Sequence, residues 1–307
     1  MDVPALKWRL PAPVALGVAV VAIGAAAILI REAEAAAVVI AFWRTAGGAA
    51  VLTPFATRHS GMLRELSWRQ RWLLVASGVC LGLHFALWLG SLELTTVASS
   101  VTLVTMSPLF VAVAATLFLG ERTSRRGWIG IGITVFGAVV IGLADSSDPG
   151  ETSNAVLGDL MALGGAAAMA GYILIGRKLR KADMPNTVFA VPTYAVAAVG
   201  LVFFAVVRGE QLTGFPASTW MILAALIAGP QLLGHAMLTL VLDRLRATTV
   251  AVATLLEPIG ATILAWIILD EVPATLFWAG APVVLVGLVV TLRSGGEALS
   301  QQVTDTV

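Results

Sequence analysis

Two charged side chains lie deep inside apolar stretches of this sequence. Arg44 stands in the run FWRTAGG, and Glu257 precedes Pro258 in the run LLEPIG. An ionisable group in a hydrocarbon environment is costly, so each must face protein, water or a ligand. The planar guanidinium of Arg44 can hold a carboxylate or a phosphate. It can also pair structurally with Glu257 or with helix-end carbonyl groups, and of the two roles we favour the structural one.

Glu257 is a candidate for proton coupling. The place that corresponds to it in the first half of the chain is occupied by the neutral Ser107, so the fold does not need a charge there. A mid-span carboxyl that is neutral when occluded and charged when open to water can carry a proton across a membrane. We therefore expect Glu257 to bind substrate, protons or both.

Histidine, aromatic and hydroxyl side chains elsewhere in the apolar stretches are further candidates for contact with a substrate. Each also has a more ordinary role, since imidazoles bond neighbouring helices, aromatic rings pack, and hydroxyls bond their own backbone carbonyls. Three of them follow helical spacing on one face, as i, i+3 and i+7. The candidates are Trp43, His84, Trp88, Ser99, Thr102, Met106, Tyr172 and His235, with the spaced three being Ser99, Thr102 and Met106.

The sequence lacks the patterns of metal, cofactor and nucleotide sites. It has a single cysteine and no HxxxH, HExxH or cysteine cluster, which argues against a metal ion. We expect no cofactor, no direct use of ATP and no nucleic-acid partner. An intramembrane enzyme would need a GxSx motif facing a histidine, a GxGD pair or clustered histidines, and none is present. We therefore do not expect an enzyme.

The composition is that of a membrane protein. Of 307 residues 58% are apolar and 12% are charged, where a soluble domain carries about 25% charged residues. Ten apolar runs have about the length that crosses the hydrocarbon core. They cover residues 12–30, 35–56, 70–91, 95–118, 126–144, 157–176, 187–207, 217–242, 248–269 and 274–292. This predicts an all-α polytopic fold.

The basic residues predict the orientation of these spans. Assigning successive linkers to alternate sides places sixteen Lys and Arg residues on the side of the N-terminus, against only Arg31 and Arg208 on the other. Basic loops stay in the cytoplasm. We therefore expect both termini to be cytoplasmic and the protein to be a multi-pass component of the inner (plasma) membrane.

An internal duplication organises the chain. Pro108, Glu121 and Trp128 precede Pro258, Glu271 and Trp278 by one common interval, which we call the repeat interval. With five helices in each half, an odd number, the halves must insert with opposite orientation. We expect two inverted five-helix repeats, residues 1–148 and 149–307, around a central cavity.

These features resemble the drug/metabolite transporter superfamily, EamA type. The resemblance rests on the ten-helix count, on the block GHAMLTLVLDRLRATTVAVATLLEPIGATILAWIILDE and its fainter copy in the first half, and on Gly280 and Gly287 in the last helix. It implies export of small metabolites from a central cavity, without indicating which solute.

The predicted function is secondary transport by alternating access. The expected partners are the lipid bilayer and a small solute, either an amino acid, especially an aromatic one, or an amphipathic drug-like compound, and the protein is expected to act as a monomer. The alternatives are an exchanger of phosphate esters or nucleotide sugars, which would want more cations than Arg44 within the spans, and a passive facilitator or channel.

Overall fold

The structure, a computed structural model, describes residues 11–119, 124–146, 154–180, 184–236 and 256–304. These ranges fold into helices joined by short loops and contain no strand. The helices are α1 (Ala12–Gly24), α2 (Ala26–Glu32), α3 (Ala37–Ala56), η1 (Thr57–His59), α4 (Ser60–Glu65), α5 (Trp68–Ser91), α6 (Val97–Val104), α7 (Ser107–Leu119), α8 (Arg125–Ser146), α9 (Ala155–Arg180), α10 (Asn186–Val207), α11 (Ala217–Leu226), η2 (Ile227–Ala236), α14 (Glu257–Ile268) and α15 (Phe277–Thr304).

Each predicted apolar run contains helix. Six helical segments are long and apolar enough to cross a membrane, and three shorter apolar helices accompany them in the described residues. The six are Ala12–Glu32, Ala37–His59, Trp68–Ser91, Ala155–Leu179, Asn186–Val207 and Ala217–Gly234. The chain is therefore a multi-pass, all-helical membrane protein in its described part, as the composition predicted.

The run 95–118 is broken, as its proline suggests. Helix α6 ends at Val104 and α7 begins at Ser107, with Pro108 in the first turn of α7. Proline has no backbone N–H, which a helix can spare only in its first turn. Helix α14 begins in the same way, with Glu257 followed by Pro258. The starts of α7 and α14 are one repeat interval apart.

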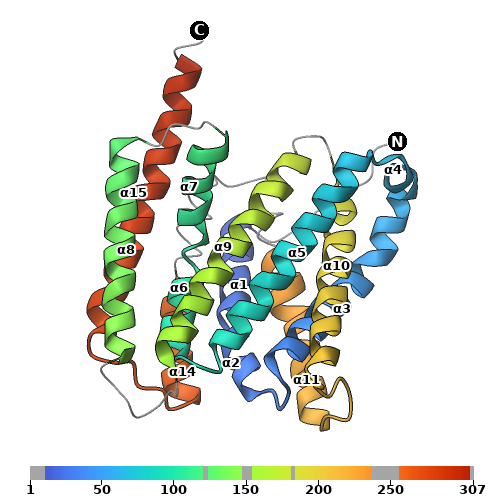
Figure 1. Cartoon of the computed structure of the whole chain (residues 1–307), viewed down its shortest axis with the longest axis horizontal. Coiled ribbons are helices and arrows are strands. Elements are labelled where there is room, and N and C mark those ends of the chain that lie inside the picture. Colours follow the sequence, from blue (N-terminus) through green and yellow to red (C-terminus); the bar gives the residue numbers. More distant parts are fainter. Residues whose placement is uncertain (1–10, 120–123, 147–153, 181–183, 237–255, 305–307) are drawn as a thin grey trace.

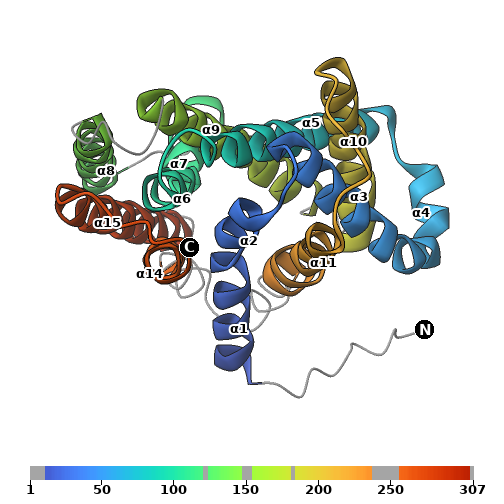
Figure 2. The ribbon, with the colours of Figure 1, turned by 90° about the horizontal axis from the view of Figure 1, so that it is seen from below.

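The helices pack in pairs that join the two halves. The most extensive pairs are α8 with α15, α5 with α9 and α3 with α10, while α1 packs on η2. Figure 1 shows α8 and α15 side by side at one edge of the molecule and α3, α10 and α11 toward the other. Seen from below, α1 and α2 cross the middle between α14 and α11 (Figure 2). Every one of these pairs takes one helix from each half.

Helices α8 and α15 approach closely through glycines. A Cβ added to Gly130 would lie 2.9 Å from the carbonyl oxygen of Gly287, and one added to Gly137 would lie 3.0 Å from that of Gly280. The partner number falls as the residue number rises, so the two helices are antiparallel. Gly280 lies one repeat interval after Gly130, and Gly287 lies one repeat interval after Gly137, so each pair contains one glycine and the counterpart of a glycine in the other pair. The two glycine pairs are therefore equivalent: replacing each half by the other converts one pair into the other.

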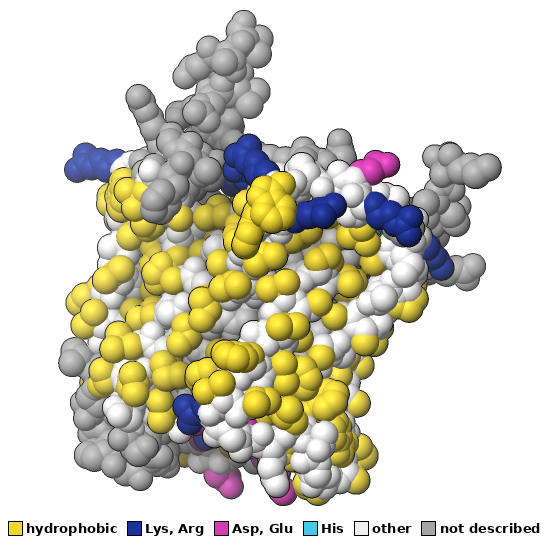
Figure 3. Space-filling view, turned by 45° about the vertical axis from the view of Figure 1, so that its right-hand side comes forward, with side chains coloured by type: hydrophobic (Ala, Val, Ile, Leu, Met, Phe, Trp, Pro, Cys, Tyr) yellow, Lys and Arg dark blue, Asp and Glu magenta, His cyan; other side chains and the backbone are white. Residues whose placement is uncertain are grey.

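Charged side chains sit at the two ends of the bundle. On the face in Figure 3, Lys and Arg side chains gather mostly along one end and Asp and Glu mostly at the other, with apolar side chains between them. At the acidic end Arg31 pairs with Glu271 at 2.8 Å and donates to the Thr95 carbonyl at 3.0 Å. The backbone N–H of Val97 donates to Glu271 at 2.9 Å. These bonds tie α2, α6 and the segment after α14 together.

Candidate functional site

Arg44 is completely buried near the middle of α3. Its Nε donates a hydrogen bond to Oε1 of Gln231 at 2.8 Å. Its guanidinium carbon lies 4.6 Å from the ring centre of Phe85 and 5.8 Å from that of Trp88, both on α5. Cations over aromatic faces are attracted by the ring quadrupole. Aromatic faces and one amide therefore hold the guanidinium in place.

Among the residues that the structure describes, none bonds the two outer nitrogens of Arg44. Nη1 and Nη2 are buried and make no hydrogen bond, and the indole Nε1 of the neighbouring Trp88 is in the same condition. Buried donors are nearly always satisfied in proteins, so each exception calls for an explanation. Together these atoms offer a buried set of N–H donors with no acceptor of the protein's own.

Gln231 is held by a relay of phenol groups. Tyr194 on α10 is hydrogen-bonded both to Gln231 and to Tyr172 on α9. Gln231 stands on η2, where the backbone takes π-helical turns around Pro230. A proline inside a helix removes one donor and clashes with the preceding turn, and wider π turns are a common way to accommodate such a disruption. The relay connects α9, α10 and η2 to Arg44 on α3.

Glu257 faces the same region from α14. It is half-buried at the first position of that helix, and its charge interacts with that of Arg44. Within the described ranges, however, no ion pair joins the two side chains. Of the two structural partners expected for Arg44, Glu257 or helix-end carbonyls, the first therefore forms no ion pair in the described part of the chain. The guanidinium and the carboxyl are close enough to influence each other and remain unbonded.

Comparison with known sequences gives the family. The sequence profile described as the EamA-like transporter family matches residues 12–143 and again residues 156–293. The chain belongs to the EamA-like transporter family. The resemblance to EamA-type exporters that the sequence indicated is thus confirmed.

Two relatives of this EamA-like chain carry functional names. The pseudopaline exporter CntI of Pseudomonas aeruginosa is 27% identical over 268 residues, which is 87% of this chain and 90% of CntI. The probable 4-amino-4-deoxy-L-arabinose-phosphoundecaprenol flippase subunit ArnE of Yersinia pseudotuberculosis is 33% identical over 78 residues, 25% of this chain and 68% of ArnE. A solved crystal structure matches 92% of this chain and 97% of its own with a TM-score of 0.61 at 20% identity. That likeness shows a shared fold.

Several predicted site residues of this EamA-like protein meet around Arg44. Trp88 contacts the guanidinium directly, Tyr172 reaches it through Tyr194 and Gln231, and Glu257 does so through its charge. His84 stacks on Trp88 with ring centres 5.8 Å apart, and its Nδ1 donates to the Gly165 carbonyl at 3.0 Å. That bond to a neighbouring helix is the ordinary role expected of a buried imidazole.

The hydroxyl face of α6 is only partly available. Ser99 is buried with no partner for its Oγ, whereas the Thr102 hydroxyl donates to its own helix, at the Ala98 carbonyl, at 2.7 Å. Met106 lies beyond the end of α6 and packs in an apolar cluster with residues of α8, α9 and α15. Ser99 and Thr102 thus lie one turn apart on α6, and Met106 follows the end of that helix.

The side chain of Trp43 is held away from the Arg44 cluster. The indole of Trp43 donates to the Leu212 carbonyl at 2.9 Å and packs edge-on against Trp220, so it faces the loop after α10. His235 lies in the last turn of η2, and its side chain falls outside the described residues.

Sequence reasoning missed three residues of the cluster: Phe85, Tyr194 and Gln231. A signal was present for the last two, because a phenol and an amide inside apolar runs, two and one positions after Pro192 and Pro230, are unusual. Phe85 gave no signal, since a phenylalanine in a membrane span is ordinary.

Proposed function

We propose that the protein is an inner-membrane secondary transporter that exports a small organic solute by alternating access and binds the solute's anionic group at Arg44. The observation that carries this proposal is the buried guanidinium with two unpartnered nitrogens, clasped by Phe85, Trp88 and Gln231. A bidentate acceptor such as a carboxylate satisfies the Arg44 fork.

The surroundings favour a solute that is otherwise apolar or aromatic. Phe85 and Trp88 offer ring faces, and Trp88 adds a further N–H donor. Tyr172 and His84 complete a mostly uncharged neighbourhood. An amino acid, especially an aromatic one, or an amphipathic acid suits this chemistry better than a phosphate ester, which would want several cations. The direction of transport follows the relative that is named as the exporter of pseudopaline.

Two inverted five-helix repeats, residues 1–148 and 149–307, give the transporter its alternating geometry. Three observations support this arrangement. The family profile matches twice in succession. Helices α7 and α14 begin one repeat interval apart. The glycine pairs of α8 and α15 exchange with one another when the halves are exchanged. The proposal also keeps both termini in the cytoplasm.

A panel of solutes tested with the purified protein in liposomes examines the function. The panel holds aromatic and aliphatic amino acids, their amides, and phosphate esters of similar size. We expect transport of acids, loss of transport for the matching amides, and accumulation against the solute's own gradient when a proton gradient is imposed. Equal rates for an acid and its amide would contradict binding at Arg44, and equilibration without accumulation would indicate a facilitator.

The variant Arg44→Lys sharpens that experiment. Lysine keeps the charge and loses the planar fork, so we expect the apparent affinity for the acid to fall at least tenfold, a difference of about 1.4 kcal/mol. The matched control is Arg58→Lys, because Arg58 also lies over an aromatic ring but is exposed, in η1 just after α3. Full activity of Arg44→Lys would refute the anchor.

A further inference from the structure

A hollow that Arg44 does not line lies along the side of the bundle. Its volume is about 710 Å³, and it runs between α5 and α10, with Met161 of α9 and the start of α3 at its edges. We call it the lateral groove. None of the predicted site residues lines it. Its volume falls within the roughly 300–1,000 Å³ of ligand pockets.

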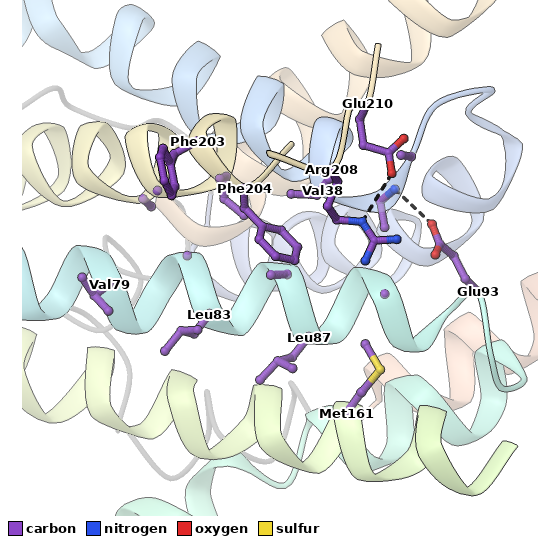
Figure 4. Close-up of a pocket in the computed structure, with 18 of the residues that line it drawn as sticks. Val38, Val79, Leu83, Leu87, Glu93, Met161, Phe203, Phe204, Arg208 and Glu210 are labelled. Carbon is purple, nitrogen blue, oxygen red and sulfur yellow. Dashed lines mark hydrogen bonds and ion pairs between the residues drawn. The ribbon is translucent and has the colours of Figure 1, made fainter. Parts of the chain in front are cut away.

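The lateral groove has a floor of small residues and an open apolar side. Gly82, Ala86 and Gly200 line it, and a Cβ added to Gly200 would meet no atom within 4 Å. Leu83 and Phe203 line it while remaining 52% and 71% exposed. Figure 4 shows Leu83 and Leu87 on α5 opposite Phe203 and Phe204 on α10. Since both helices are of membrane-spanning type, the groove opens toward lipid.

Charges of both signs close one end of the lateral groove. Arg208 pairs with Glu210 at 3.5 Å, and Glu93 accepts a hydrogen bond from the backbone N–H of Ala37 at 3.1 Å. All three charged side chains line the groove and gather at one end of it (Figure 4). The Arg208 side chain is 60% exposed. This end offers one cation and two carboxylates beside an apolar channel.

We propose that the lateral groove binds a bilayer phospholipid with a primary-amine headgroup, such as phosphatidylethanolamine. The acyl chain lies between α5 and α10, the phosphate meets Arg208, and the ammonium meets Glu93 and Glu210. An anionic headgroup without an amine gains only Arg208 and is repelled by the two carboxylates. A quaternary ammonium has no N–H to donate. The charge pattern therefore selects the zwitterion with a primary amine.

Native mass spectrometry of the purified full chain tests the proposal. The protein is equilibrated with equal amounts of phosphatidylethanolamine, phosphatidylcholine and phosphatidylglycerol that share the same acyl chains. We expect phosphatidylethanolamine to be retained several-fold over both others. Arg208→Ala should lower this retention about fivefold, the equivalent of ~1 kcal/mol, and Gly200→Leu should abolish it by filling the groove.

Two matched variants control for general effects. Arg58→Ala removes an arginine that, like Arg208, lies over an exposed phenylalanine, and Gly132→Leu adds the same side chain at another open, exposed helical glycine. Both should retain lipid as the wild type does. Equal retention of the three lipids, or full retention by Gly200→Leu, would overturn the proposal. A dimer that Gly200→Leu converts to a monomer would also overturn it, and would assign the groove to a second copy of this chain. This test measures lipid retention and not transport, so either proposal can be refuted without affecting the other.

Discussion

The two halves of the chain build similar helices, but they differ where the polar cluster lies. Helix α5 in the first half is regular over Trp68–Ser91, whereas the matching run of the second half changes from α11 to the π turns of η2 after Leu226. Helix α7 starts with the neutral Ser107 and α14 with Glu257. At the contact of α8 with α15, by contrast, the halves contribute matching glycines, Gly130 with Gly280 and Gly137 with Gly287.

This difference separates scaffold from site. A glycine that must approach a backbone is needed in both copies, so the α8–α15 contact keeps its symmetry. Gln231 lies in the π turns that α5 lacks and bonds Arg44, and Glu257 stands where the first half has the neutral Ser107 and interacts with Arg44 through its charge. Departures from local rules are expected at functional sites. The asymmetry therefore supports the proposal that a ligand binds beside Arg44.

The largest effect is expected where the halves agree. A Cβ at Gly287 would lie 2.5 Å from the backbone nitrogen of Thr134 and 2.8 Å from the Gly130 oxygen. Gly287→Leu should therefore force α8 and α15 apart at a cost at or above the roughly 1–3 kcal/mol of overpacking. Gly137→Leu in the other half should do the same. Thermal unfolding in detergent measures both.

Gly132→Leu is the control for this pair. A Cβ at Gly132 meets no atom within 4 Å, so its melting temperature should stay within a few degrees of the wild type. If only one of Gly137→Leu and Gly287→Leu were damaging, the contact would not be symmetric in energy as it is in geometry.

Much of the scaffold could be predicted from the sequence. Apolar runs of membrane length can hardly form anything but helices, because every backbone polar group must be satisfied internally. The break before Pro108 followed from the missing N–H of proline. The π turns of η2 did not, since Pro192 and Pro54 also lie inside helices that remain α-helical. Which backbone absorbs a proline depends on the packing around it.

Of the candidate site, the sequence clearly indicated only the charged residues. Arg44 and Glu257 stood out because a charge in a span demands a reason. Whether the two side chains would form an ion pair depends on their distance in the folded chain, which the sequence does not give. Phe85 was missed because a phenylalanine is ordinary in a span, and Gln231 because a single amide beside a proline is a weaker signal than a charge. The orientation of Trp43 is set by its hydrogen bond to a loop carbonyl, and the periodicity of a sequence gives no sign of such a contact.

A smaller effect is expected from replacing the polar Gln231 of the second half by an apolar residue. Gln231→Leu removes the acceptor of the Arg44 Nε hydrogen bond, and such a bond to a charged group contributes about 1.5–3 kcal/mol. The solute's apparent affinity should fall roughly tenfold to a hundredfold, measured in liposomes, with the melting temperature little changed. Tyr194→Phe, one step further along the relay, should weaken affinity less. Equal losses for the two variants would mean that the relay acts through packing.

The smallest change in transport rate, but the clearest change in its pH dependence, is expected from replacing Glu257 at the start of α14 by a residue that does not titrate. Glu257→Gln keeps the shape of the side chain and removes its titration, and Glu257→Ser copies Ser107 of the other half. If Glu257 exchanges a proton while it is open to water and carries it while occluded, the wild type should transport at a rate that depends on pH near neutrality, and both variants should lose that dependence. Exchange of solute for solute, which needs no net proton movement, should survive in both.

Because Arg44 keeps its contacts with Gln231, Phe85 and Trp88 in these variants, solute affinity should change less than in Gln231→Leu. A variant that keeps the wild-type pH profile would show that Glu257 is part of the scaffold after all, and that the two halves differ in charge at this position without differing in function.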